Sequence, residues 1–365
     1  MDKRILLNGV FLNRIIHYIS QSIHDPDFIR RNIRKKGDFS RKRKLDFARI
    51  FVFILRKSAL SLQLWLFTFC SQIANTTNDK NLTITLPAFS QARIKFAFSA
   101  FIEINTTICN FFYNLTMNIQ WYKTWKSYRL FAIDGSKLIL PDNKKTREKF
   151  ALMKNKKNCI VTTYLWTTLS VMYDLLNHIA VVTVLDNKGN ERKMAIKHIN
   201  NFVKSFKKLL PVLVICDRWY FWIEVFHTFL SNNIDFVIRI TRRSYKEAME
   251  LFKIDCPIHE KIVEFSHKNT DGEIVKILVR FVRIVLDTWE IEVLATSLID
   301  AKQYPIDEFK QLYHLRWGIE TYYHKIKALL VLENFSGLTP EAVEQDIYAT
   351  ILFSNLESMF SKEVN

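Results

Sequence analysis

The sequence predicts an α/β protein in which helices flank a mixed sheet, with a helical N-terminal region and a β-rich insertion. Two observations carry this prediction. Apolar residues recur at helical spacing through most of the first 125 residues, where proline and glycine are nearly absent. From residue 130 the pattern changes to short apolar runs bounded by turn-like Asp-Asn-Lys segments, which is typical of strands. Strands and helices then alternate, so a sheet with both parallel and antiparallel neighbours is expected.

The helical region contains two segments whose role the sequence leaves open. Residues 30–44 form a basic run, interpreted either as a solvated, flexible arm or as a surface that contacts phosphate. The basic side chains considered for phosphate contact are Arg41, Lys42, Arg43 and Lys44. Residues 58–78 lack charge for long enough to span a membrane, but their interior Ser, Thr and Gln residues favour a helix buried in protein. No membrane partner is therefore expected.

The remaining elements follow in order along the chain. Three consecutive antiparallel strands are expected at 130–140, 160–172 and 178–185, then a helix at about 191–209 and buried strands at 211–216 and 235–240. The last helices are expected at 306–332 and 340–360, with a further helix at 94–112 in the N-terminal region. We expect four domains or parts of domains, with boundaries at 1–125, 126–240, 241–299 and 300–365.

Composition narrows the class of partner. The 365 residues carry a formal net charge of +17, which predicts strong, salt-dependent attraction to a polyanion such as DNA or RNA. Hydrophobic residues make up 49% and charged residues 24%, which argues against a disordered or multi-span membrane protein. The five cysteines are odd in number and never spaced as Cys-x-x-Cys, so neither a disulfide framework nor a zinc site is supported. Without a secretion signal, a reducing cytoplasm fits best.

Two aspartates lie where a strand would place a ligand-binding group. Asp134 falls in the run Phe-Ala-Ile-Asp-Gly-Ser, in the middle of an expected strand where an isolated carboxylate is costly to bury. Asp217 ends the run Val-Leu-Val-Ile-Cys-Asp, at the carboxyl end of a buried strand, where open α/β sheets usually bind ligands. Each aspartate alone is equally well explained as a carboxylate in a turn or at a helix cap. A third carboxylate would make them a metal site.

That third carboxylate comes from the helix expected at 306–332. Tyr313, Arg316, Glu320 and Lys327 stand at offsets of 0, 3, 7 and 14 residues, which places them on one helix face. A solvated polar side of an amphipathic helix is the simpler interpretation. The other interpretation is a site for phosphodiester transfer, because two Mg²⁺ ions about 4 Å apart can activate the attacking oxygen and stabilise the leaving one. Carboxylates are the ligands that Mg²⁺ prefers, with Mn²⁺ as a substitute.

These residues resemble those of the DDE transposases of the IS-four family, whose signature is Tyr, two residues, Arg, three, Glu, six, Lys. Tyr313, Arg316, Glu320 and Lys327 match that spacing in full. Other segments similar to the family follow in family order across residues 32–355. They are Ala-Ile-Asp-Gly-Ser-Lys around Asp134, Tyr-Asp-Leu-Leu-Asn from Tyr173, Glu191-Arg192, Cys-Asp-Arg-Trp-Tyr around Asp217 and Glu-Asn-Phe-Ser-Gly from Glu333.

The resemblance implies a fold, an activity and a set of roles. It implies an RNase H-like core and a helical region that binds terminal inverted repeats. Members cleave the ends of their element, commonly through a hairpin, and join them to target DNA, so a homodimer in the synaptic complex is expected, associated with the bacterial nucleoid. Asp134, Asp217 and Glu320 would be the catalytic residues and would hold two divalent cations. Tyr313, Arg316, Lys327 and Arg218 would contact DNA, together with the basic run.

Two departures from the family leave alternatives open. Trp219 stands where the family often has glycine after Asp-Arg, and the chain ends ten residues after Asn355. A DNA-binding relic that is defective in catalysis or synapsis is therefore an alternative, as are a nuclease that cuts branched DNA without joining it and a basic protein of membrane surfaces. Trp219 and Trp289 are candidates for stacking a flipped base, although packing is the simpler role for each.

Overall fold

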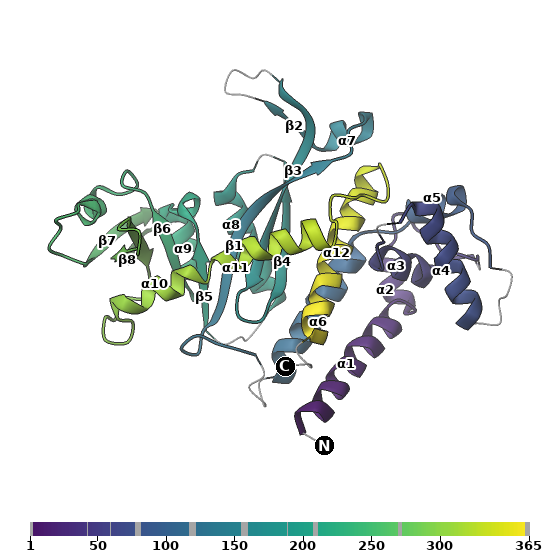
Figure 1. Ribbon diagram of the computed structural model, residues 1–365, viewed down its shortest axis with the longest axis horizontal. Coiled ribbons are helices and arrows are strands. Elements are labelled where there is room, and N and C mark those ends of the chain that lie inside the picture. The colour runs from purple at the N-terminus through teal and green to yellow at the C-terminus, as the bar shows by residue number, and fades with distance from the viewer. Residues whose placement is uncertain are drawn as a thin grey trace. The chain divides into compact units, whose positions relative to one another are not determined.

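The computed structural model describes residues 3–41, 43–58, 60–76, 82–116, 122–154, 160–187, 189–206, 211–268 and 272–361. The chain forms two compact units, and each is made of segments that are far apart in the sequence. The first unit comprises residues 1–119, 138–166 and 324–365, and the second comprises residues 120–137 and 167–323. Figure 1 shows the elements of both units.

The first unit is mainly helical. Its helices are α1 (Lys3–Ser22), α2 (Pro26–Arg31), α3 (Phe47–Leu55), α4 (Leu62–Thr76), α5 (Leu86–Arg93), α6 (Ser99–Thr116), α7 (Lys144–Lys149) and α12 (Pro340–Ser361). It also contains the short strand β2 (Ala151–Lys154) and a π-helical turn at Lys325–Leu329. The α12 helix is buried along most of its length and packs beside α6 and α3 (Figure 1). The rings of Phe51, Phe96 and Phe101 pack against one another in the core, which explains the helical apolar spacing of these segments.

A buried polar network ties the end of α5 to the start of α12. The Arg93 guanidinium donates to Gln345 Oε1 at 2.7 Å and to Asp346 Oδ1 at 2.6 Å. It also donates to Ser336 Oγ at 2.8 Å and to the carbonyl of Ala342 at 3.0 Å. These bonds satisfy a charged side chain that is only 5% exposed, so they offset the cost of burying it.

Gly337 belongs to the same network through its lack of a side chain. A Cβ at this position would lie 2.6 Å from the Cβ of Ala342 and 3.1 Å from Arg93 Nη1. The Ser-Gly pair of the Glu-Asn-Phe-Ser-Gly segment is therefore explained by packing: Ser336 bonds Arg93 and Asp346, and Gly337 permits the close approach.

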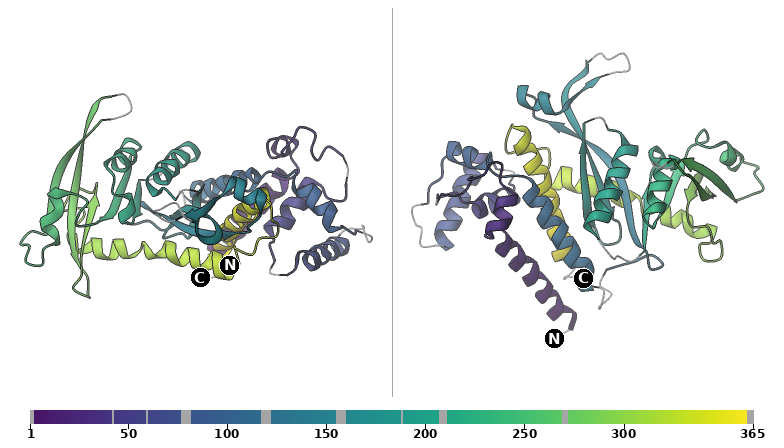
Figure 2. Two further views of the ribbon diagram at one scale, coloured as in Figure 1. Left: turned by 90° about the horizontal axis from the view of Figure 1, so that it is seen from above. Right: turned by 180° about the vertical axis from the view of Figure 1, so that it is seen from behind.

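The second unit is built on the sheet. Its elements are β1 (Arg129–Leu140), β3 (Ile160–Asp174), β4 (Ile179–Asp186), α8 (Glu191–Ser205), β5 (Val212–Cys216), a 3₁₀ turn (Arg218–Tyr220), α9 (Ile223–Ser231), β6 (Ile234–Ile240), a second 3₁₀ segment (Lys246–Phe252), β7 (Glu260–Lys268), β8 (Ile274–Val285), β9 (Ile291–Thr296), α10 (Ile306–His314) and α11 (Trp317–His324). The unit boundaries fall within β1 and β3 and directly before His324. Helices α8 and α9 lie on one face of the sheet, and α10 and α11 lie on the other (Figure 2).

The strand order in the described chain is β2-β3-β1-β5-β6-β9-β8-β7, with β4 beside β3. Strands β1, β5 and β6 are parallel neighbours, whereas β3–β4, β6–β9, β9–β8 and β8–β7 are antiparallel. This mixed sheet between helices confirms the predicted α/β class. Because β1, β5 and β6 run in one direction, their carboxyl ends meet at one edge of the sheet, where open α/β sheets bind ligands.

Some expected elements differ from the structure. The helix expected at 94–112 begins only at Ser99, because buried Phe96 instead forms a β-bridge with Ile33. The single helix expected at 306–332 is divided into α10, α11 and the π-helical turn. The division falls where the amide of Arg316 bonds to the carbonyl three residues back, at Tyr313.

The uncharged segment at 58–78 forms α4, and only one side of it is buried. Trp65 and Phe69 pack into the unit, but Phe67 is 70% exposed, so the expectation of a buried helix holds for half of its surface. Within the described residues, no helix is long and apolar enough to cross a membrane.

Candidate active site

The register of the parallel strands brings the two aspartates together. Ile133 of β1 is paired with Cys216 of β5, so Asp134 and Asp217 take the next position on adjacent strands. Glu320 comes from the first turn of α11. The charges of Asp217 and Glu320 both act on the Asp134 carboxyl, so each of them lies within electrostatic range of Asp134. All three are partly exposed.

Asp134 is held in an unusual local setting. Its Oδ1 accepts the main-chain N–H of Gly135 at 2.8 Å. A Cβ at Gly135 would lie 3.0 Å from Thr168 Cγ2, which explains glycine at this position of the Asp-Gly-Ser segment. Burial, together with the neighbouring carboxylates, raises the pKa of Asp134 to about 6, although the Gly135 N–H and the Arg316 charge act in the opposite direction.

A fourth carboxylate, Glu191, belongs to this site. It begins α8, and burial together with the charges of Asp134 and Asp217 raises its pKa to about 7. Our sequence analysis quoted the Glu191-Arg192 pair only as a family-like segment and assigned it no role. Its position just after the Asp-Asn-Lys-Gly turn, at the start of a helix that returns to the sheet, is the signal that could have placed it near the strand ends.

Arginines neutralise two of the carboxylates. Arg239 donates to Asp217 Oδ1 at 3.0 Å and pairs with Glu292 at 2.5 Å. Arg316, which is 5% exposed, donates to Glu320 Oε1 at 2.8 Å. The hydroxyl of Tyr313 lies 3.4 Å from Asp217 Oδ1. Sequence reasoning missed Arg239, although the pairing of Cys216 with Ile238 places Arg239 beside Asp217 once the register is known.

The donor set fits divalent cations in its chemistry. Asp134 and Glu191 form no ion pair with any described residue, so the site keeps negative charge that a cation would neutralise. Every candidate ligand is a carboxylate oxygen, which Mg²⁺ and Mn²⁺ accept. Within the described part of the chain, however, no three Asp, Glu, His or Cys side chains are arranged to hold a metal ion. Asp217 and Glu320 would have to turn from their arginines to do so.

The remaining candidate residues differ in their surroundings. Lys327 lies in the π-helical turn of the first unit, where burial lowers its pKa while the Glu333 charge acts against that shift. Arg218 is exposed beside Asp217, and its guanidinium lies 5.5 Å from the centre of the Trp219 ring. The packing role expected for the two tryptophans is wrong, because Trp219 is 56% and Trp289 is 86% exposed.

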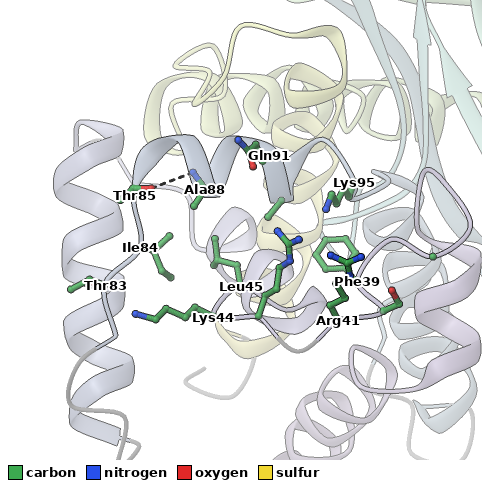
Figure 3. A pocket seen from close by; sticks show the side chains of 14 residues that line it. Phe39, Arg41, Lys44, Leu45, Thr83, Ile84, Thr85, Ala88, Gln91 and Lys95 are labelled. Atoms are coloured by element: carbon green, nitrogen blue, oxygen red, sulfur yellow. Dashed lines mark hydrogen bonds between the residues drawn. The ribbon is translucent and has the colours of Figure 1, made fainter.

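Part of the basic run lines a hollow in the first unit. Arg41, Arg43 and Lys44 are exposed and line a cavity of about 520 Å³ together with Lys95 (Figure 3). The remaining lining residues include no acidic side chain. The amide of Arg34 bonds to the carbonyl of Lys95 at 2.9 Å, which fastens this part of the run to the end of α5. Lys42 lies outside the described residues.

The pKa shifts of Asp134 and Glu191 predict that the metal-free protein is less stable at neutral pH than in mild acid. Both carboxyls bind their proton more tightly in the folded protein than in the unfolded chain, so their contribution to the stability of the fold is complete below their ordinary pKa values. It is lost as the pH rises through about 6 for Asp134 and about 7 for Glu191. For Asp134, a rise from 3.8 to about 6 corresponds to a loss on the order of 3 kcal/mol above pH 7.

Thermal unfolding at pH 5 and pH 7.5, in EDTA and in Mg²⁺ or Mn²⁺, measures this effect. We expect the cations to raise the melting temperature much more at pH 7.5 than at pH 5, because only ionised carboxylates bind them. Asp134→Asn should flatten the pH dependence in EDTA. An unchanged pH profile in that variant would show that Asp134 does not titrate as described.

The chain is similar to known transposases. Residues 125–356 match the family model described as "Transposase DDE domain". The chain is 22% identical over 339 residues to "Transposase InsG for insertion sequence element IS4" of Escherichia coli strain K12, which covers 91% of this chain and 74% of that protein. A solved structure of the piggyBac transposase in a synaptic complex with hairpin DNA has a TM-score of 0.50 at 10% identity, covering 95% of this chain and 75% of that one.

The family match covers the segments that carry Asp134, Asp217 and Glu320. The similarity to the piggyBac structure supports the RNase H-like fold and, at 10% identity, nothing finer. Three findings agree: the Tyr-Arg-Glu-Lys spacing, the order of the family-like segments, and the match over most of the chain. This chain belongs to the IS4 family of DDE transposases.

Proposed function

We propose that this transposase cleaves DNA at the terminal inverted repeats of its element and joins the freed ends to target DNA, using Asp134, Asp217 and Glu320. The observation that carries the proposal is the placement of Asp134 in β1 beside Asp217 at the end of β5, with the charges of Asp217 and Glu320 both acting on Asp134. Two divalent cations, Mg²⁺ or Mn²⁺, bound by the three side chains would activate the attacking oxygen and stabilise the leaving one.

The surrounding residues orient the site and receive the DNA backbone. Arg316 and Arg239 each hold one carboxylate in place. Their fixed guanidinium groups can donate to a phosphodiester when DNA enters, since planar donors suit phosphate oxygens. Arg218 is exposed beside Asp217 and is a further contact for the backbone. Tyr313 is 6% exposed, and its hydroxyl faces Asp217, so it orients that carboxylate as well as forming one side of the site.

Cleavage of a labelled duplex that carries the element's own terminal repeat tests the proposal. Nicks at the repeat boundary that require Mg²⁺ or Mn²⁺, followed by strand-transfer products with a target plasmid, would support it. Nicks without joining would indicate a nuclease. Binding of the repeat without cleavage in either metal would favour the DNA-binding relic and overturn the proposed activity of this chain. Sizing the complex on paired ends would test the expected homodimer.

The hollow lined by Arg41, Arg43 and Lys44 is proposed as part of the surface that holds terminal-repeat DNA. Its cations are exposed, and its lining includes no acidic side chain, so it offers donors for several phosphates. Residues 1–125, which contain it, are the proposed DNA-binding region. Lys327 and Lys42 remain predicted DNA contacts.

Replacing Arg41 and Arg43 together by glutamine should weaken DNA binding and reduce its salt dependence. Each lost phosphate contact lowers the slope of log affinity against log salt by about 0.9, so the pair should lower it by about 2. Fluorescence anisotropy with a terminal-repeat duplex at several salt concentrations measures the slope.

The matched control is Lys144→Gln with Lys145→Gln, which removes the same charge from exposed positions that lie outside the basic run and do not line the hollow. We expect the control to change the slope much less. An equal reduction in both double variants would mean that overall charge, and not the hollow, holds the DNA.

A further inference from the structure

The main-chain carbonyl of Asp134 is bound by two side-chain hydroxyls. Tyr323 Oη donates to it at 2.7 Å, and Ser170 Oγ donates at 3.0 Å. Ser170 is fully buried and Tyr323 is 6% exposed. A carbonyl oxygen has two lone pairs, so these hydroxyls use its full accepting capacity. The strand is thereby fixed at the residue that carries a candidate catalytic carboxylate.

The two hydroxyls come from different elements. Tyr323 lies in α11, three residues after Glu320, so both side chains project from nearly the same side of that helix. Ser170 lies in β3, the strand beside β1. Tyr323 Oη also lies 3.1 Å from the carbonyl of Leu169 in β3. Tyr323 therefore joins the helix of Glu320 to the strand of Asp134 at the level of the site.

His198 completes the network from behind the sheet. It is fully buried in α8, and its Nε2 lies 2.9 Å from Ser170 Oγ. Because Ser170 gives its single hydrogen to Asp134, it must accept one from His198, which requires hydrogen on Nε2. Burial lowers the pKa of His198 to about 3, so the ring is neutral at physiological pH. Its Nδ1 has no partner among the described residues, which agrees with this tautomer.

We propose that Tyr323 is a positioning residue, whose hydroxyl sets the separation of Glu320 and Asp134, and that Ser170, oriented by His198, fixes Asp134 from the other side. This proposal rests on the proposed function of the two carboxylates. The residues act through the main chain of Asp134 and do not touch substrate. Partners of this kind that orient ligands typically change metal affinity or activity by about 10- to 100-fold when they are lost.

The first test is Tyr323→Phe, which removes the hydroxyl and keeps the ring. The matched control is Tyr322→Phe, which removes a buried hydroxyl from the preceding residue of the same helix, where the ring stacks on Tyr173. We expect Tyr323→Phe to lower the rate of DNA cleavage by about 10-fold or more. Binding of terminal-repeat DNA in EDTA should be unchanged, and thermal unfolding should show that both variants are folded.

Mn²⁺ binding to the DNA-free protein, followed by electron paramagnetic resonance, gives a readout that does not depend on cleavage. Tyr323→Phe should bind Mn²⁺ at least about 10-fold more weakly than the control variant. If wild-type protein binds Mn²⁺ but does not cleave DNA, the proposed function fails while the positioning role is still measured. Equal loss of Mn²⁺ affinity in both variants, or no loss in Tyr323→Phe, would overturn the positioning role.

A double-mutant cycle with Ser170→Ala tests whether both hydroxyls act through the same carbonyl. If they do, the effect of the double variant on Mn²⁺ affinity should differ clearly from the product of the single effects, because the two share one acceptor. Strictly multiplicative effects would show that Tyr323 and Ser170 act independently, and would contradict the shared role.

Discussion

Glu320→Gln is expected to abolish metal-dependent DNA cleavage, with a loss of at least about 10³-fold. A cation at a transferring phosphate is worth several kcal/mol of transition-state stabilisation, and each 1.4 kcal/mol is tenfold in rate. The substitution removes one charged ligand but keeps an oxygen that can accept from Arg316, which now donates to Glu320 at 2.8 Å. The fold and the binding of DNA should therefore survive.

A steady-state nicking assay at matched salt, paired with DNA binding in EDTA, measures both effects. Glu247→Gln is a suitable control, because Glu247 is an exposed carboxylate of the same unit that lies outside the site. We expect it to cleave at the wild-type rate. Cleavage by Glu320→Gln within about threefold of wild type would exclude Glu320 as a ligand, since the loss of a ligand charge is worth several kcal/mol.

The sequence was sufficient for the fold class and for the position of two carboxylates. A buried apolar run that ends in an acid, such as the one before Asp217, predicts both a strand and the end of that strand at which ligands usually bind. The family-like segments then indicated Glu320 as the third candidate carboxylate. These predictions depend on local pattern, and the mixed sheet confirms the class that they imply.

What the sequence could not predict depends on register between distant segments. Arg239 pairs with Asp217 only because β5 and β6 align Cys216 with Ile238, and no periodicity in either strand fixes that alignment. Tyr323 likewise appears as one more aromatic residue of a core stripe. Its bond to the carbonyl of Asp134 spans 189 residues of sequence.

The helix that carries Glu320 shows what helical periodicity alone does not predict. Equal helical spacing predicted one face for four side chains, but the helix is interrupted near Arg316 and again at the π-helical turn. Each interruption changes the angular phase, so offsets counted along one ideal helix do not apply across it. Main-chain bonds at the interruptions, which periodicity does not encode, decide the outcome.

Arg93→Met is expected to destabilise the first unit by about 3 to 5 kcal/mol. The substitution leaves the carboxylate of Asp346, which is 1% exposed, without its cation, and an uncompensated buried charge is costly. It also removes the N–H groups that donate to Gln345, Ser336 and the carbonyl of Ala342. The network joins positions 253 residues apart, so its loss should loosen α5 and α12 together.

Hydrogen exchange of the α5 and α12 amides in increasing urea reports this unit by itself. Arg30→Met is the matched control, because Arg30 pairs with Asp27 at 3.0 Å on the surface, with both side chains mostly exposed, and such pairs contribute about 1 kcal/mol or less. Arg93→Met with Asp346→Leu should recover part of the loss, since the buried charge is then gone from both sides. A change in Arg93→Met no larger than in Arg30→Met would mean that the network does not hold α12 in place, and that the apolar contacts of α12 with α3 and α6 do so instead.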